Sequence, residues 1–279
     1  MKNIHAGVLI LCLISASIPL RAQEKLAAAQ IGSRIDVTIG GKFFTSYRFA
    51  ADEKYPFFFP VNGPSGASVT SMRNGEYPHH SSLFFGCDMV NGGNYWQEAL
   101  DRGRIVSKGP VLEVASGNEI IIRDTCDWTR PGAPQPFRDT RRIIISAPSP
   151  TLRQIDFEIT LEATEEVVIR KTNHSLFSSR MDPDLTPVHG GTMLNADGDK
   201  GEKGTFGKPS PWLACFGADY GFLSPTPMFW PANGKDTPIA KGEKLRLGYR
   251  VLVFSGTPET AGIAANFKEF SGAKPNPTK

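Results

Sequence analysis

The sequence predicts an all-β protein, built as an antiparallel β-sandwich of two packed sheets. Short segments that alternate apolar and polar residues recur along the chain, which is the period of half-buried strands. Glycine (28 residues) and proline (22 residues) are plentiful, as expected of many strands joined by turns. A βαβ rhythm, heptads and fixed-length repeats are absent from the sequence, which disfavours parallel-sheet, coiled-coil and repeat architectures.

The strand predictions follow the chain in order, and each rests on alternation interrupted by a turn sequence. A final segment has apolar residues at helical spacing and predicts the one clear helix. The segments are a hairpin at residues 34–49 around Gly-Gly, a second at 109–128 around Ser-Gly-Asn, two strands at 141–164 joined by Pro-Ser-Pro, a strand at 165–172, a strand pair at 241–256 and the helix at 259–272.

Composition limits the classes of partner. The chain has 279 residues, 40% of them hydrophobic, which is enough for a sizeable core in one large β domain. The formal net charge of +3 is too small to indicate nucleic acid or an anionic membrane surface as the partner.

The N-terminus has the pattern of a signal peptide. A basic Lys2 precedes the apolar run of residues 6–20, and the small Ala22 follows. We expect residues 1–22 to be removed before Gln23, which leaves a single domain, residues 23–279, exported to the periplasm or the extracellular space. No later apolar run approaches the roughly 20 residues that span a bilayer, so no membrane span is expected after cleavage.

The cysteines give no metal-binding pattern. Removal of the leader leaves Cys87, Cys126 and Cys215, an odd number at wide spacings and without a CxxC pair, so no structural zinc site is predicted. We expect buried free thiols, with one disulfide plus one free thiol as the alternative in an oxidising compartment.

The stretch NGEYPHHSSLFFGCDMVNGGNYW, residues 74–96, holds the main candidate site. In a regular strand His79 and His80 point to opposite faces, so the two cannot chelate one metal ion. Asp88, Asn91 and Trp96 follow, and a carboxylate, an amide and an aromatic ring are typical fittings of a sugar site. The alternative is a strand whose histidines are satisfied by backbone groups.

Further candidates lie beyond this stretch. Lys171 and Arg180 flank His174, and two cations beside a histidine suit a sugar acid or another carboxylate, unless they are a solvated strand end. His189 lies in a loop before two glycines. Residues 195–204 alternate Asp and Gly as calcium loops do, but lack the spacing and closing Glu of an EF-hand, so an ordinary loop is favoured.

Several segments resemble the bacterial PmoA-like family, whose members look like exported all-β proteins of polysaccharide-degrading bacteria. The likeness rests on YPFFFPVNGPSGASVT and YPHHSSLFFGCDMVNGGNYW and extends over most of the mature chain. Methane oxidation, which the family name suggests, is rejected because a true membrane subunit spans the bilayer several times. Residues 241–256 and the strand content are also similar to the β-supersandwich of galactose-mutarotase-like proteins, an analogy of fold alone.

The chain also departs from the family pattern. Ser81 stands where the resemblance implies Arg, and Lys-Thr-Asn at 171–173 stands for Lys-Glu-Gly. A Trp-His-x-Arg segment, at least one strand long, is missing before Asp219. The resemblance therefore supports only the site residues at matching positions, which are His79, His80, Asp88, Asn91, Trp96, Lys171 and Arg180.

These observations predict a protein that acts on or binds a saccharide. The expected mechanism is general acid–base chemistry by His80 or His79 with Asp88 as partner, while Lys171 and Arg180 stabilise an anionic group. Asn91, Trp96 and His189 are the other predicted ligand contacts, and neither a metal nor a cofactor is expected. A non-catalytic saccharide-binding protein and a domain for macromolecular interaction are the alternatives.

Overall fold

The computed structural model describes residues 24–73, 75, 77–172, 175–183, 191–216, 222–225 and 235–272. The predicted signal peptide lies outside these residues. So do His174, His189 and the segment immediately before Asp219, so the predictions on them stay predictions.

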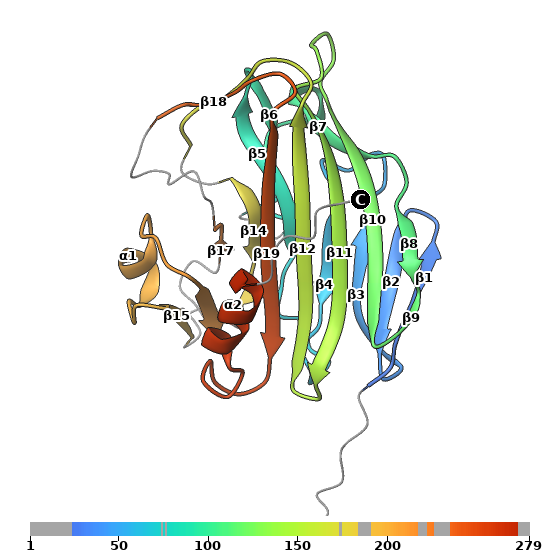
Figure 1. Ribbon diagram of the computed structural model, residues 1–279, viewed down its shortest axis with the longest axis vertical. Coiled ribbons are helices and arrows are strands. Elements are labelled where there is room, and N and C mark those ends of the chain that lie inside the picture. The colour runs from blue at the N-terminus through green and yellow to red at the C-terminus, as the bar shows by residue number, and fades with distance from the viewer. Residues whose placement is uncertain are drawn as a thin grey trace, which may run out of the picture.

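Two antiparallel sheets pack face to face, and the hydrophobic core fills the space between them (Figure 1). The predicted all-β sandwich is therefore confirmed. The finer likeness to the galactose-mutarotase-like supersandwich stays a prediction.

The larger sheet is formed mostly by the N-terminal part of the chain. The predicted hairpin at residues 34–49 is present, and Gly40 and Gly41 form its turn with φ of 57° and 76°, the left-handed region that glycine adopts without strain. In spatial order the strands are β17 (Phe222–Leu223), β14 (Leu176–Arg180), β5 (Leu83–Val90), β4 (Phe57–Val61), β3 (Lys42–Arg48), β2 (Arg34–Ile39), β1 (Leu26–Ile31) and β9 (Ser116–Gly117), with β6 (Gly93–Tyr95) and β13 (Val167–Ile169) beside β5, and β18 (Thr237–Ile239) beside β13.

The second sheet contains the longest strands. Its order is β19 (Lys244–Phe254), β12 (Leu152–Ala163), β11 (Phe137–Ser149), β10 (Glu119–Thr129) and β7 (Arg104–Ser107), with β8 (Val111–Val114) also on β10. The predicted strand pair at 241–256 is wrong, because this segment is the single strand β19, paired with β12 over its whole length. Alternation runs through Gly248 without a turn residue in a left-handed conformation, so nothing reverses the chain there.

The helices and a small two-stranded sheet lie at one side of the sandwich (Figure 1). The predicted C-terminal helix is confirmed as α2 (Ile263–Gly272), whereas the short α1 (Gly201–Thr205) was not predicted. A small sheet of β15 (Thr192–Asn195) and β16 (Leu213–Phe216) lies beside α1, and a 3-10 turn, η1 (Leu100–Arg102), follows β6.

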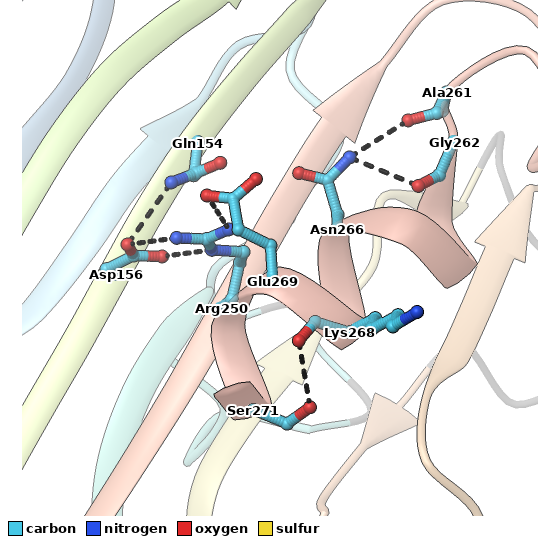
Figure 2. A network of polar contacts seen from close by, with 9 residues as sticks. All are labelled: Gln154, Asp156, Arg250, Ala261, Gly262, Asn266, Lys268, Glu269 and Ser271. Carbon is cyan, nitrogen blue, oxygen red and sulfur yellow. Dashed lines mark hydrogen bonds and ion pairs between the residues drawn. The ribbon is translucent and has the colours of Figure 1, made fainter. Parts of the chain in front are cut away.

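Helix α2 is attached to β19 by an ion-pair network (Figure 2). The Arg250 guanidinium binds both carboxylate oxygens of Asp156 on β12, at 2.7 and 2.8 Å, and lies 3.4 Å from Glu269 of the helix. The same guanidinium lies 4.9 Å from the centre of the Phe270 ring. Arg250 therefore joins the last strand, its neighbour and the helix.

Polar contacts are also buried within the core. The Tyr47 hydroxyl of the larger sheet donates to Asp124 of the second sheet at 2.7 Å. Arg141 forms two hydrogen bonds with Asp139, at 2.8 and 3.1 Å, and both side chains are fully buried. These buried charges tolerate desolvation because they are paired and hydrogen-bonded.

The three cysteines of the described chain are free thiols. Cys87 and Cys126 are buried, as predicted, whereas Cys215 is partly exposed. Burial raises the pKa of the Cys215 thiol to about 12 and raises that of Cys87 further, so both are protonated at neutral pH. In the described part of the chain, no helix is long and apolar enough to cross a membrane.

Candidate functional site

The two neighbouring histidines lie in a turn, not in a strand. Strand β5 begins only at Leu83, because Ser82 has a φ of 62° and breaks the extended backbone. The prediction that both histidines belong to a regular strand is therefore wrong. Their rings do not point to opposite faces, and the ring centres of His79 and His80 lie 4.3 Å apart.

His80 is the inner member of a stack of side chains. Its side chain is buried, and its ring lies parallel to the Tyr77 ring with the centres 5.2 Å apart. The Arg180 guanidinium lies over the Tyr77 ring, 4.3 Å from its centre, in the geometry of a cation–π contact. The structure thus brings Arg180 into the histidine cluster and gives His80 a packing role.

His79 faces a cavity of about 410 Å³, which we call the histidine pocket. Three segments form this pocket: the connection before β4, the turn before β5 and the connection after β6. The residues that line it are 52–55, Arg73, Pro78, His79, Ser81 and 96–100. Of the predicted site residues in the described chain, His79 and Trp96 line it.

Tyr55 supports the pocket from the core side. Its ring stacks on Phe84 of β5, with the centres 4.6 Å apart, and its hydroxyl donates to the backbone oxygen of His79 at 2.8 Å. This bond fixes the turn that carries the histidine. Burial raises the pKa of the Tyr55 phenol well above its ordinary value, so Tyr55 remains a neutral donor.

Asn94 and Gly86 hold the opposite wall. The Asn94 side-chain oxygen accepts the backbone N–H groups of Trp96 and Gln97, both at 2.9 Å, which folds the start of this segment into a tight turn. A Cβ atom at Gly86 would lie 2.9 Å from the Tyr95 backbone oxygen, so only glycine allows this close approach.

The charged residues of the pocket have unequal partners. Arg73, at a φ of 50°, forms an ion pair with Glu53, and Glu98 lies 3.0 Å from Arg102. The Lys54 ammonium instead donates to a neutral group, the Ala99 backbone oxygen, at 2.9 Å. Burial lowers the pKa of Lys54 to about 8, because desolvation disfavours its charged form.

Asp88 lies at the other end of β5 and does not meet the histidines. Leu83 and Asp88 are separated by roughly 16 Å of strand, at about 3.3 Å per residue. The Asp88 carboxylate is buried and accepts the hydroxyl groups of Thr172 and Ser175, each at 2.9 Å. The structure therefore does not form the predicted histidine–aspartate pair, and Asp88 anchors the segment that leads into β14.

Asn91 and Lys171 are not among the residues that line the pocket, and their hydrogen bonds join other segments. The Asn91 amide donates to Glu165 and to the Glu166 backbone oxygen, and its oxygen accepts the Val168 N–H at 2.8 Å. Lys171 is exposed, and its backbone N–H donates to the Asp236 carboxylate at 3.2 Å. Neither arrangement brings the side chain to the histidines.

Trp96 lines the pocket without offering a ring face. Its side chain is only 1% exposed, and its ring packs edge-on against Phe84 with the centres 5.0 Å apart. The predicted stacking of a sugar on the Trp96 ring therefore lacks an exposed ring face.

The residues that the sequence prediction missed lie in the connection before β4. Glu53, Lys54 and Tyr55 come directly before the apolar strand of residues 57–61, in the stretch DEKYPFFF. A run of three charges beside a buried aromatic strand was the available signal. It could not be distinguished from a solvated turn, because its partners at 73 and 99 are distant in sequence.

A second cavity, of about 380 Å³, lies beneath α2. Its lining is mainly apolar, with Phe177 of β14, Trp212 near β16, Val253 of β19 and Ile263 of α2. The described residues contain no cluster of three or more His, Cys, Asp or Glu side chains that could hold a metal ion. In the 195–204 loop, Asp199 instead pairs with Lys208 at 3.1 Å.

A family model described as a family of unknown function (DUF6807) matches residues 34–220. This range contains every residue that lines the histidine pocket and ends before β19 and α2. The comparison with curated proteins finds no match to the chain.

Proposed function

The chain belongs to the DUF6807 family, and we propose that it binds a saccharide in the histidine pocket. The observation that carries this proposal is the cavity itself. At about 410 Å³ it lies in the range of small-molecule sites, roughly 300–1,000 Å³. Its walls combine an imidazole, hydroxyls, carboxylates and cations, the groups that hydrogen-bond sugar hydroxyls.

The hydrogen bonds that hold the walls of the pocket favour a preformed site. Tyr55 fixes the turn of His79 through a hydrogen bond, and Asn94 fixes the opposite wall through backbone N–H groups. A site held in its bound geometry loses less conformational entropy on binding than a mobile one. We expect the pocket walls to keep their backbone conformation when the ligand binds.

His79 carries a second candidate function, catalysis on the bound saccharide. Its imidazole is half-buried and lines the pocket together with Glu53 and Glu98. Histidine beside carboxylates suits general acid–base chemistry at neutral pH, as in an epimerase, lyase or hydrolase. In this proposal His79, and not His80, contacts the substrate, because His80 is buried within the side-chain stack.

The test is a proton NMR time course with a panel of monosaccharides and oligosaccharides. Binding is expected to broaden ligand signals in the wild-type protein and to be lost in His79→Ala. New anomeric signals that form more slowly as the pH falls through about 6.5 would establish catalysis by the histidine. Absence of both effects for the whole panel would overturn the saccharide proposal.

Export is part of the same proposal. It rests on the basic, apolar and small-residue pattern of residues 1–22. N-terminal sequencing of the protein recovered from the periplasm or medium is expected to begin at Gln23. Recovery of the intact Met1 terminus from the cytoplasm would contradict it.

A further inference from the structure

Lys54 is held across the histidine pocket at both of its ends. Its backbone oxygen accepts the Ile105 N–H at 2.9 Å, and its ammonium donates to the Ala99 backbone oxygen, also at 2.9 Å. The side chain therefore spans from the connection before β4 to the wall after β6. This fixes the position of the charge relative to both walls.

The ammonium has unused hydrogen-bonding capacity. A lysine ammonium carries three donors, and the Ala99 oxygen occupies one of them. Among the described residues, no carboxylate lies within 4.0 Å of the Lys54 nitrogen. The pocket is lined by the carboxylates Asp52, Glu53 and Glu98. Glu53 and Glu98 are paired with Arg73 and Arg102, and Asp52 is exposed to solvent.

A half-buried cation without a paired anion is electrostatically costly, and a bound anion would compensate for the lost hydration. Among the neighbouring charges, Glu98 and Asp101 attract the Lys54 charge, and Arg104 and Arg102 oppose it to a smaller extent. The lowered pKa of Lys54 shows that desolvation is the larger effect.

We propose that the histidine pocket selects acidic saccharides, whose carboxylate binds the Lys54 ammonium while His79 contacts the hydroxyl groups. This inference rests on the proposed saccharide function and adds the class of ligand and the residue that selects it. A uronic acid unit, which is a sugar with a carboxylate at its terminal carbon, has the required chemistry.

The proposal implies uptake of a proton. A bound carboxylate favours the charged ammonium and raises the pKa of Lys54 above its value of about 8 in the free protein. Near pH 8.5 the free side chain is partly deprotonated, so binding of an acidic saccharide must draw a proton from the buffer. A neutral saccharide leaves the protonation of Lys54 unchanged.

The test is isothermal titration calorimetry of the full chain with galacturonate and with galactose. Measurements at pH 7 compare the wild type with Lys54→Gln, which removes the charge, Lys54→Arg, which keeps it, and Lys42→Gln, which removes an exposed lysine on β3. Titrations at pH 8.5 in two buffers of different ionisation enthalpy measure the number of protons taken up.

We expect galacturonate to bind the wild type at least tenfold more tightly than galactose. Lys54→Gln is expected to abolish this preference, whereas Lys54→Arg and Lys42→Gln retain it. Proton uptake is expected with galacturonate only.

Three results would overturn the proposal in distinguishable ways. Equal affinity for the two sugars would remove the acidic preference and leave saccharide binding in place. A preference that persists in Lys54→Gln would assign the selection to another cation. Absence of binding by either sugar, in a protein shown to be folded by circular dichroism, would overturn this inference; the saccharide function falls with it only when the whole panel of saccharides also fails to bind.

Discussion

The polar residues near the two ends of strand β5 have different roles. At the start of the strand, His79 faces a cavity and Lys54 has donors to spare. At its end, both oxygens of Asp88 already accept hydroxyl groups from Thr172 and Ser175. A buried carboxylate with its hydrogen bonds satisfied stabilises the fold, whereas polar groups that line a cavity remain available to a ligand.

The largest test of this contrast is Asp88→Ala. The substitution leaves the Thr172 and Ser175 hydroxyls without their acceptor in a buried site, so we expect a loss of about 3 kcal/mol in the free energy of unfolding. Urea denaturation followed by circular dichroism measures the change. Asp52→Ala, at an exposed position, is the matched control and should change stability by less than about 0.5 kcal/mol.

Saccharide binding by folded Asp88→Ala is expected to equal that of the wild type. A stable Asp88→Ala variant that no longer binds would reverse the assignment and return Asp88 to the ligand site.

A second test acts on the middle of β5. In Gly86→Ala the new methyl group meets the Tyr95 backbone oxygen at 2.9 Å and the Tyr55 ring at 3.5 Å. Overpacking of this kind costs about 2 kcal/mol and should shift Tyr55, and with it the turn of His79. Thermal melts and saccharide titrations should therefore show both lower stability and weaker binding.

Gly63→Ala provides the comparison for that variant, because its nearest neighbour would lie at an ordinary 3.5 Å. If Gly86→Ala lost stability but bound the saccharide normally, the coupling between β5 and the pocket would be wrong.

A third test separates the adjacent histidines. His79→Gln should weaken saccharide binding about tenfold, which corresponds to about 1.4 kcal/mol, with little change in stability. His80→Gln should do the reverse and lower the free energy of unfolding by about 1.5 kcal/mol, because it breaks a buried ring stack. Titration calorimetry and urea denaturation of both variants decide between the roles. Equal effects on binding would reject the division between a contact residue and a packing residue.

The smallest expected effect is the pH dependence contributed by Lys54. Its folded pKa of about 8 lies below the ordinary lysine value of about 10.4, so between these pH values the unfolded chain binds more protons. The contribution of Lys54 to the free energy of unfolding therefore rises with pH across that window. Below pH 8 the side chain is charged in the folded state, so the folded protein bears the full cost of its desolvation. Lys54→Met should be more stable than the wild type at pH 7, by less than about 1 kcal/mol because water screens this half-buried group.

Thermal melts at several pH values between 7 and 10 measure that difference, which should shrink as the pH rises. A difference that stays constant would mean that Lys54 is not desolvated. Asp88→Asn, at the opposite end of β5, serves as a control that should leave the pH dependence of this window unchanged.

Local patterns predicted the sheets well. Alternation and glycine turns predicted the β2–β3 hairpin and the β11–β12 pair, because period and turn chemistry are properties of neighbouring residues. The same patterns did not show that residues 241–256 form one strand, since its partner β12 is distant in sequence.

The candidate site was harder to predict. His79 was named as a candidate because the sequence marks it locally, but its separation from Asp88 depends on how far β5 extends and where it begins. Lys54 and Arg73 were missed because they become candidates only through the cavity that they line, and three segments separated in sequence enclose that cavity. Ser82, a single residue in the left-handed conformation, decides the orientation of the histidine turn. The alternation of apolar and polar residues does not predict this conformation.

The position of β19 has a consequence for synthesis of the chain. Eleven of the twelve residues of β12 pair with β19, which is synthesised only after the residues between Ala163 and Lys244. Until then the growing chain presents an unpaired edge of twelve residues, a template on which other chains can add strands. The Arg250–Asp156 ion pair, which joins β19 to β12, can form only after β19 has been synthesised. We therefore expect a chain truncated before Lys244 to aggregate and not to fold as a shortened domain.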